Sequence, residues 1–372
     1  MTQSELSEHR SYLADAVRVE AYKAALTEIV RSGDVVLDLG AGTGVLGYLA
    51  LEAGAASVIA LERGDIIEMA QSIAADNGYA DRITYVKALS SEAFLDRRVD
   101  VVVCDQIGGL VHDAGILSAF ADARERFLAP GGRLVPASFR IFAAPVQYDE
   151  AREEIEFWST SPAGVDMRAV RPMAANTEWM IHLSAGDLVP LADAHELAAF
   201  PSHADGPIHA DVQFEVGTGG RLDGFLGWFR ARLSPSVTLT NDPWASDHFR
   251  RWCNFYPLDK AVAAEPGDHL GFEFDVRPRS KIVSWTTTVE GMQGSQETRQ
   301  STFLTNSRED LFERTMPVPA KSLDLARRVL DEIDGTRTPQ EIVDRLSGAI
   351  GTTFASRAHL ENFVRRVTGV VR

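Results

Sequence analysis

The chain has 372 residues, which is more than one ordinary hydrophobic core contains, so two or three domains are expected. Its hydrophobic fraction of 45% and charged fraction of 24% are typical of globular proteins, and no apolar run approaches the roughly 18 to 20 residues that span a bilayer. The formal net charge of −16 argues against a nucleic-acid partner. It fits a cationic substrate, although a merely soluble acidic protein would have the same charge.

The amino terminus and the cysteines indicate the compartment. Residues 1–5 lack the basic and then apolar pattern of a signal peptide, so we expect a cytoplasmic protein with no membrane partner. Cys104 and Cys253 are far apart, and neither belongs to a C-x-x-C pair. We expect two buried thiols and no metal site.

Apolar segments alternate with helical sequence over residues 1–138, after an amino-terminal helix. Repeated βα units of this length predict a parallel, doubly wound, Rossmann-like sheet whose ligands bind at the carboxyl ends of the strands. The Pro130-Gly131-Gly132 sequence predicts a turn before the fifth strand. The expected strands are 35–39, 57–61, 83–87, 99–104 and 133–136, with helices such as 66–77 and 117–128 between them.

Three glycines follow the first expected strand. Gly40, Gly42 and Gly44 stand at alternate positions, two residues after Asp38. A Cβ there would keep the backbone away from a ligand, and a positive φ is favourable only for glycine. The dinucleotide fingerprint G-x-G-x-x-G would place its third glycine at Val45. This departure favours S-adenosylmethionine (SAM) over NAD as the cofactor.

Glu62 closes the second expected strand, 24 positions after Asp38. A carboxylate at this strand end can accept hydrogen bonds from both ribose hydroxyls. Taken alone, Glu62 is equally well explained as a surface residue at a strand end. Its spacing in the sequence from the glycine loop favours a role in binding the ribose.

From residue 139 onward the pattern changes to short alternating segments with turns between them. Residues 225–233, 269–276 and 282–289 predict antiparallel strands, separated by polar, proline-containing stretches at 161–177 and 235–247. We therefore expect a β-sandwich or β-barrel domain over residues 139–312.

Residues 317–372 predict a small helical domain. Pro317 and Pro319 mark a linker, and amphipathic helices are expected over 323–333 and 357–367. Between them, the segment from Thr338 to Glu341 has the sequence of a capping box. This region has nine Lys and Arg against seven Asp and Glu, a net charge of +2, so the remainder carries −18. Three such helices suit a winged-helix-like module.

Residues 10–300 resemble the protein arginine methyltransferases, which are class I SAM-dependent enzymes. The matching pieces are the segment 12–18, the glycine loop 37–46, Glu62, and the change to a β-barrel after residues 134–136. The resemblance implies that Arg18 binds the methionyl carboxylate of SAM, that Glu62 binds the ribose and that residues 87–92 border the adenine. The expected residues for SAM and its product S-adenosylhomocysteine are Arg18, Asp38, Gly40, Gly42, Gly44, Leu46, Glu62, Arg63, Ala88, Leu89, Ser91 and Asp105.

The chemistry of arginine agrees with the role that the resemblance gives to Arg18. A guanidinium on a helix that covers the glycine loop can make a forked ion pair with a carboxylate, whereas a lysine cannot reproduce the bidentate contact. The alternative is that Arg18 simply faces water.

The loop after the fourth strand departs from the arginine methyltransferases. In that family two glutamates of this loop hold the substrate guanidinium. Asp105 falls on the first of them, but Ala114 falls on the second. The bidentate clamp is therefore broken, unless His112 or Asp113 substitutes for it.

The Thr-His-Trp loop of the family is also altered. Its counterpart is Arg250-Arg251-Trp252, with His248-Phe249 as a competing alignment that would bring Asp247 or His248 to the acceptor. Adjacent arginines favour an anionic acceptor such as a carboxylate, or pair with Asp105; alternatively they lie on a solvated face. The expected acceptor-binding residues are Tyr12, Gln106, Arg250, Arg251 and Trp252.

Methyl transfer from a sulfonium is an in-line displacement, so the protein mainly has to align donor and nucleophile. A nitrogen cation also needs a group that orients it and accepts its proton, whereas a carboxylate acceptor needs no base. We expect Asp105 to orient the acceptor, with His112, Asp113 and His248 as further candidates for proton transfer.

Three functions remain open from the sequence. The first is a SAM-dependent methyltransferase acting on a side-chain nitrogen of a peptide or protein. The second is a small-molecule or carboxyl O-methyltransferase in natural-product or peptide maturation, and the third is a non-catalytic SAM-binding scaffold.

The carboxyl-terminal helices are similar to winged-helix domains that bind leader peptides, which implies that they present a peptide substrate. They alternatively cover a sheet edge or a dimer contact. The arginine methyltransferase resemblance implies a homodimer formed through an arm at residues 161–177.

Overall fold

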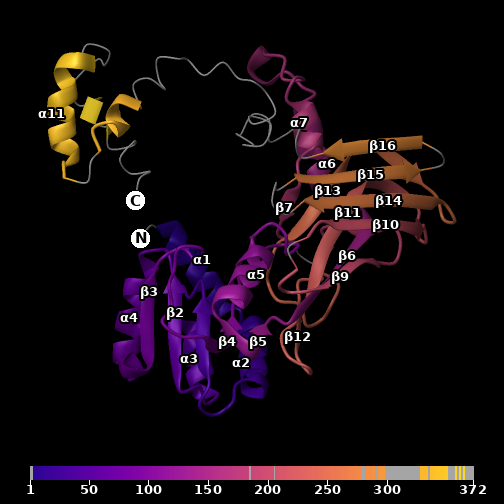
Figure 1. Ribbon diagram of the computed structural model, residues 1–372. Helices are drawn as coiled ribbons and strands as arrows, with labels where there is room; N and C mark the ends of the chain where they lie inside the picture. The colour runs from indigo at the N-terminus through magenta and orange to yellow at the C-terminus, as the bar shows by residue number, and fades with distance from the viewer. Residues whose placement is uncertain are drawn as a thin grey trace. The chain divides into compact units, whose positions relative to one another are not determined.

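The computed structural model describes residues 3–183, 186–204, 206–277, 282–289, 292–297, 327–333 and 336–350, together with residues 357, 360, 361, 363 and 364. The chain divides into two compact units, Met1–Asn306 and Ser307–Arg372. The first unit contains a parallel sheet and two antiparallel sheets (Figure 1).

Two helices precede the parallel sheet, α1 (Gln3–Ala14) and α2 (Ala16–Ile29). Asp15 caps α2, because its Oδ1 accepts a hydrogen bond from the backbone N–H of Arg18 at 3.1 Å. The buried Tyr22 joins α2 to the sheet by donating its hydroxyl to the carbonyl of Cys104, at 3.0 Å. The cap and this bond fix the helix that carries Arg18.

The five parallel strands have the order β3-β2-β1-β4-β5. All residues of β1 are buried, as expected for a strand with both faces covered. The strand order reverses between β1 and β4, and ligands of doubly wound sheets bind at such a switch point. The predicted fold of this domain is confirmed. The strands are β1 (Val35–Leu39), β2 (Ser57–Glu62), β3 (Ile83–Lys87), β4 (Val99–Val103) and β5 (Leu128–Val135), and the intervening helices are α3 (Val45–Glu52), α4 (Ile66–Asp76), η1 (Ala80–Arg82) and α5 (Ile116–Arg126).

The fifth strand differs from its prediction. It begins at Leu128, so Pro130-Gly131-Gly132 lies within β5 and not before it. Val99 pairs with Leu128 but Val101 pairs with Arg133, so the extra residues form a bulge. The φ of +77° at Gly131 permits this bend without a steric cost.

Two antiparallel sheets follow, which confirms the predicted second fold class. One has the order β7-β13-β11-β6-β8, with β12 paired to β11 and β9 paired to β6, and the other has the order β10-β14-β15-β16. They pack through aromatic side chains such as Phe225 and Phe272, whose ring centroids lie 4.1 Å apart. The strands are β6 (Ser138–Gln147), β7 (Trp179–Ile181), β8 (Val189–Pro190), β9 (His195–Pro201), β10 (Ile208–Glu215), β11 (Gly220–Arg232), β12 (Thr238–Thr240), β13 (Cys253–Ala264), β14 (His269–Arg277), β15 (Ile282–Val289) and β16 (Met292–Glu297).

The segment between β6 and β7 contains three short helices. These are α6 (Asp149–Phe157), η2 (Pro162–Gly164) and α7 (Arg171–Ala175). A buried ion pair joins α6 to β11, because Arg152 Nε lies 3.2 Å from Asp223 Oδ1. Asp223 also accepts the backbone N–H of Tyr148 at 2.8 Å, so its carboxylate fixes the start of this helical segment.

We expect Asp223→Asn to lower the free energy of unfolding by about 3 kcal/mol, because it leaves the buried Arg152 guanidinium with only the more exposed carboxylate of Glu156, 3.4 Å away, as a counter-charge. Urea unfolding followed by tryptophan fluorescence measures the change. Asp166→Asn is the matched control, since it breaks an exposed pair with Arg168, for which about 0–1 kcal/mol is expected. Equal effects of the two substitutions would contradict a structural role for Asp223.

The carboxyl-terminal unit has a small core of its own. Its helix α11 (Pro339–Ile350) begins with the predicted capping box, since Thr338 N donates to Glu341 Oε2 at 2.8 Å and Glu341 N donates to Thr338 Oγ1 at 3.3 Å. The predicted linker at Pro317–Pro319 and the first four residues of the helix expected at 323–333 lie outside the described residues, as does part of the helix expected at 357–367. Its buried apolar side chains are Val329, Ile342, Val343, Leu346, Leu360 and Val364.

Two further expectations concern the cysteines and the membrane. Cys104 and Cys253 are free and buried, as predicted. Within the described ranges, none of the helices combines the length and apolarity that crossing a bilayer requires.

Candidate functional site

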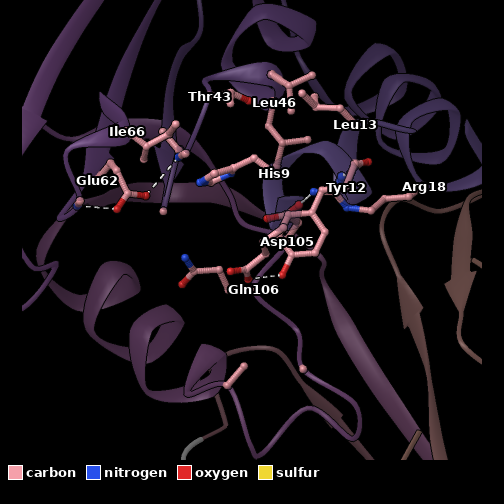
Figure 2. A pocket seen from close by; sticks show the side chains of 18 of the residues that line it. His9, Tyr12, Leu13, Arg18, Thr43, Leu46, Glu62, Ile66, Asp105 and Gln106 are labelled. Carbon is pink, nitrogen blue, oxygen red and sulfur yellow. Dashed lines mark hydrogen bonds and ion pairs between the residues drawn. The ribbon is translucent and has the colours of Figure 1, made fainter. Parts of the chain in front are cut away.

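A cavity of about 510 Å³ lies at the carboxyl ends of β1, β2 and β4, where the strand order reverses. Helix α1, the glycine loop, the loop after β2 and the loop after β4 line it. Strand β7 adds Met180, and the segment before β13 adds Arg251 and Trp252. Figure 2 shows Glu62 and Ile66 at one end of the cavity, and Tyr12, Arg18 and Asp105 at the other.

The glycine loop has the backbone conformation that its sequence predicts. Gly40, Gly42 and Gly44 have φ of +76°, +54° and +85°, and Gly44 is the N-cap of α3. The backbone N–H groups of Gly40 and Ala41 both donate to the carbonyl of Leu61, at 2.8 and 3.0 Å. The loop therefore bends over the end of β2 and exposes its backbone to the cavity.

Asp38 lies behind this loop. Its Oδ2 accepts a hydrogen bond from the Gly47 N–H at 2.9 Å, and the residue is only 1% exposed. Burial raises the pKa of Asp38 to about 7. Asp38 is not among the residues that line the cavity. Its hydrogen bond to Gly47 instead joins the end of β1 to α3 on the two sides of the glycine loop.

Glu62 faces the cavity from the end of β2. Its Oε2 accepts from Gly42 N at 3.1 Å and its Oε1 accepts from Gly64 N at 2.7 Å. Two loops therefore hold the carboxylate in place. Carboxylate oxygens keep further lone pairs for hydroxyl donors such as those of a ribose.

Arg18 is the buried cation of the site. It is 5% exposed, its guanidinium pairs with Asp105, and Nη1 donates to the carbonyl of Tyr12 at 2.8 Å. Burial lowers the pKa of Arg18, which still leaves an arginine charged at neutral pH. A buried guanidinium at one end of the cavity can bind a carboxylate of a ligand.

Around Tyr12, at the same end of the cavity as Arg18, aromatic rings lie next to a second guanidinium. The Arg251 guanidinium carbon lies 5.1 Å from the ring centroid of Tyr12 and 4.9 Å from that of Trp252. Arg251 Nε donates to the carbonyl of Gly108 at 3.3 Å. Burial raises the pKa of the Tyr12 hydroxyl, which therefore stays neutral.

These observations fit SAM. Backbone close to the cavity, a carboxylate at the end of β2 and a buried guanidinium near Asp105 suit a nucleoside that ends in an amino acid.

Residues 23–138 match the family described as ribosomal protein L11 methyltransferase (PrmA). The chain is also 29% identical to protein arginine N-methyltransferase 6 of Xenopus tropicalis over 316 residues, which are 80% of this chain and 92% of that protein.

Solved structures share the fold. The Trypanosoma brucei PRMT1 enzyme-prozyme heterotetrameric complex with AdoHcy matches with a TM-score of 0.69 at 19% identity, over 78% of this chain and 98% of that one. Arabidopsis thaliana protein arginine methyltransferase 10 matches with a TM-score of 0.67 at 20% identity, over 79% and 98%. The chain is a class I SAM-dependent methyltransferase that resembles the protein arginine methyltransferases.

Most predicted site residues of this methyltransferase meet at the cavity. Others lie outside its lining: Ala88, Leu89 and Ser91 follow β3, and His248 Nδ1 contacts the carbonyl of Ala245 at 2.6 Å. The predicted residues that line the cavity are Tyr12, Arg18, Gly40, Gly42, Leu46, Glu62, Arg63, Asp105, Gln106, Asp113, Arg251 and Trp252. Those outside the lining are Asp38, Gly44, Ala88, Leu89, Ser91, His112, His248 and Arg250.

The two adjacent arginines of the methyltransferase have different positions. Arg251 lines the cavity, whereas the backbone N–H of Arg250 donates to Asp15 Oδ2 at 2.7 Å. Asp15 therefore joins the cap of α2 to the segment before β13. His112 is also buried away from the lining, next to Glu178.

Sequence reasoning missed several lining residues. His9 and Leu13 come from α1, and Met180 comes from β7 with 60% of its surface exposed. None of them belongs to a motif with a chemical signature. Spacing within α1 gives one signal for two of them, because His9 precedes Tyr12 by three residues and Leu13 by four, and positions three and four residues apart share a face of a helix.

The positions of the methyltransferase's site residues fit the parts of SAM. Arg18 would bind the carboxylate of the methionine part, and Glu62 would bind the ribose hydroxyls. The backbone of the glycine loop would contact the part of SAM between them. Bound SAM supplies an electrophilic methyl group on a sulfonium. The protein then has to exclude water and align the acceptor, and α1 covers the cavity through His9 and Tyr12 (Figure 2).

We expect Gly42→Val to lower the affinity for SAM roughly 10- to 100-fold, because a Cβ there lies 3.0 Å from His9 and a valine at φ of +54° is strained by about 1–3 kcal/mol. Titration calorimetry with SAM measures the change. Gly78→Val has the same kind of strain, at φ of +76°, but no neighbour within 4 Å and no place in the cavity. Its affinity for SAM should stay at the wild-type value, and equal losses in both variants would contradict the assignment of the loop.

Proposed function

We propose that this methyltransferase transfers the methyl group of SAM to a guanidinium nitrogen of an arginine in a peptide or protein. One observation carries the proposal: the Asp105 carboxylate lies at the end of the cavity, next to Arg18 and within the loop after β4. The name of the relative with 29% identity, an arginine N-methyltransferase, supports the same acceptor.

Asp105 suits a guanidinium acceptor for electrostatic reasons. When the carboxylate of SAM pairs with Arg18, Asp105 is released to accept hydrogen bonds from the acceptor. A carboxylate opposite the guanidinium also offsets the charge of its nitrogen groups while the nucleophile approaches the methyl carbon. Transfer forms the N–C bond and breaks the S–C bond, so the sulfur becomes neutral and the charge of the methylated group rises from +1 to +2. Loss of a proton from that nitrogen, to Asp105 or to water, returns the charge to +1.

Asp113 supplies a second carboxylate on the same loop. It lines the cavity, and its Oδ2 accepts the backbone N–H of Gly109 at 2.8 Å. It stands one position before Ala114, which occupies the place of the second glutamate in arginine methyltransferases. We infer that Asp105 and Asp113 together bind the acceptor cation.

The test uses SAM with a trideuterated methyl group and synthetic peptides that contain arginine. Mass spectrometry should find additions of the labelled methyl group on arginine and none on matched peptides in which lysine or citrulline replaces it. Labelling only of lysine, or only of carboxyl groups, would overturn the assignment of arginine.

A second acceptor is favoured by Arg251. Its guanidinium lies in the cavity near Tyr12 and Trp252, where a cation suits a carboxylate acceptor. In that case the enzyme is a carboxyl O-methyltransferase acting on a small molecule or a maturing peptide. Base-labile methyl groups would identify esters, because methylated guanidines survive mild alkali.

Three wider expectations accompany the proposal. We propose a homodimer through the arm at residues 161–177, where Val165 is exposed. We also propose that the unit Ser307–Arg372 presents a peptide substrate, and that the protein acts in the cytoplasm. Light scattering tests the dimer, and deletion after residue 312 tests presentation, because an unchanged acceptor KM would exclude it.

A further inference from the structure

A buried ion pair lies behind the loop after β4, on the side away from the cavity. His112 Nε2 lies 3.0 Å from Glu178 Oε1, and the side chains are 4% and 16% exposed. The two residues come from different parts of the first unit, since His112 belongs to the loop and Glu178 directly precedes β7. The sequence made His112 a candidate for proton transfer, but the side chain lies outside the cavity lining, and no role has been given above to Glu178.

Two hydrogen-bond donors and one ion pair hold Glu178. Besides His112, Asn254 Nδ2 donates to its Oε1 at 2.6 Å, and the Tyr256 hydroxyl donates to the same oxygen at 2.5 Å. Burial would raise the pKa of Glu178, but the charge of His112 and these hydrogen bonds outweigh it and lower that pKa. The carboxylate is therefore ionised in the interior.

His112 faces acceptors on both sides of its ring. Nδ1 lies 3.1 Å from the carbonyl of Leu110, and Nε2 faces Glu178, so both nitrogens need a proton. Burial would lower the pKa of His112, but the charge of Glu178, its hydrogen bond and the charge of Asp113 raise it to about 9. His112 is thus an imidazolium at neutral pH.

The other groups around His112 do not compete for this charge. The Phe274 ring of β14 lies 6.4 Å from the imidazole ring, and the pKa of Tyr256 on β13 is raised far above its usual value by burial. Asp113, next to His112 in the loop, directs its carboxylate to the backbone of Gly109. Glu178 is therefore the direct counter-charge of the imidazolium.

The loop between Asp105 and Asp113 contacts β13 and the segments before it closely. A Cβ on Gly109 would lie 2.0 Å from Asn254 Oδ1, and Asn241 Nδ2 donates to the carbonyl of Gly109 at 2.8 Å. One face of the loop thus packs on the antiparallel sheet, while Asp105 and Asp113 line the cavity on the other face.

We propose that His112 and Glu178 are positioning residues: their ion pair fixes the loop after β4 against the antiparallel sheet and so sets where Asp105 and Asp113 meet the acceptor. This inference rests on the acceptor role proposed for Asp105. The proposal predicts an effect on acceptor turnover and not on SAM binding. The side-chain partners of Arg18 are Asp105 and the carbonyl of Tyr12, and those of Glu62 are the backbone N–H groups of Gly42 and Gly64.

The test compares His112→Gln, Glu178→Gln and the double variant with wild type. We expect kcat/KM for the acceptor to fall roughly 10- to 100-fold in each, since small misplacements cost this much. SAM affinity should stay within about twofold, because distant sites act independently. The kcat/KM of the double variant should fall no further than that of either single variant, because His112 and Glu178 act together as one ion pair. His209→Gln, which breaks the exposed pair with Asp275 at 2.9 Å, is the matched control and should leave kcat/KM unchanged.

The pH profile gives a readout that a purely structural role would not move. Below about pH 9 the imidazolium is charged and the pair is intact, and above it the pair is lost as His112 deprotonates. Wild-type kcat/KM for the acceptor should therefore fall above about pH 9, and the fall should be missing in His112→Gln. An identical alkaline fall in both proteins would overturn the proposal.

Two measurements remain decisive even if arginine is not the acceptor. Nuclear magnetic resonance of labelled histidine should place the pKa of His112 near 9 in wild type and below its usual value in Glu178→Gln. Hydrogen exchange of residues 105–114 should accelerate in His112→Gln while residues 35–46 stay unchanged. Ordinary titration of His112, or unchanged exchange of the loop, would refute the positioning role, whereas the absence of arginine methylation by wild type would refute only the proposed function.

Discussion

Arg18→Ala is expected to lower the affinity for SAM about 100-fold, because a charged hydrogen bond in a buried site contributes about 1.5–3 kcal/mol and 100-fold corresponds to about 2.8 kcal/mol. Arg18→Lys should lose about tenfold, since an ammonium keeps the charge but not the forked geometry. Titration calorimetry with SAM and with S-adenosylhomocysteine measures both.

Lys23→Ala provides the control for Arg18, because Lys23 lies on the same helix and is exposed. Its affinity for SAM should equal that of wild type. Wild-type affinity in Arg18→Ala would show that the guanidinium pairs only with Asp105 and does not bind the ligand.

Asp105→Asn is expected to lower kcat by roughly 10²- to 10⁴-fold, because the amide retains the shape of the side chain but neither orients a cation nor accepts a proton. The affinity for SAM should not fall, since the substitution removes a competitor for Arg18. Single-turnover assays with trideuterated SAM separate the chemical step from binding.

The control for Asp105 is Asp96→Asn, which neutralises an exposed aspartate of the loop before β4. Its kcat should match wild type. A carboxylate acceptor predicts the opposite result for Asp105→Asn, because loss of a like charge near the acceptor would leave turnover unchanged or raise it.

The parallel sheet was predictable because β1, β2 and β4 are mostly apolar and alternate with helical sequence. The predicted bounds of β1 and β3 agree with the structure, and those of β2 and β4 differ by one residue at one end. The bulge in β5 was not predictable, because Pro130-Gly131-Gly132 suits a turn between elements as well as an irregular strand. The sequence of one strand does not show which residues of the neighbouring strand it pairs with.

The cofactor end of the site was easier to predict than the acceptor end. The glycine loop and Glu62 belong to one βαβ unit, so their spacing carries the information. His112 meets Glu178, and Arg251 meets Tyr12, only after two domains pack together. Such long-range contacts leave no spacing pattern in the chain, which is why the partner of His112 was not anticipated.

The carboxylate of Asp15 connects the helix that carries Arg18 to the segment that carries Arg251. One oxygen accepts from the start of the helix that carries Arg18, and the other accepts from the backbone of Arg250, next to the Arg251 that lines the cavity. A ligand that steadies either segment also steadies the other, and such coupling is reciprocal by thermodynamic necessity. Donor and acceptor should therefore strengthen each other's binding, and the order in which they arrive should not change the size of that cooperativity.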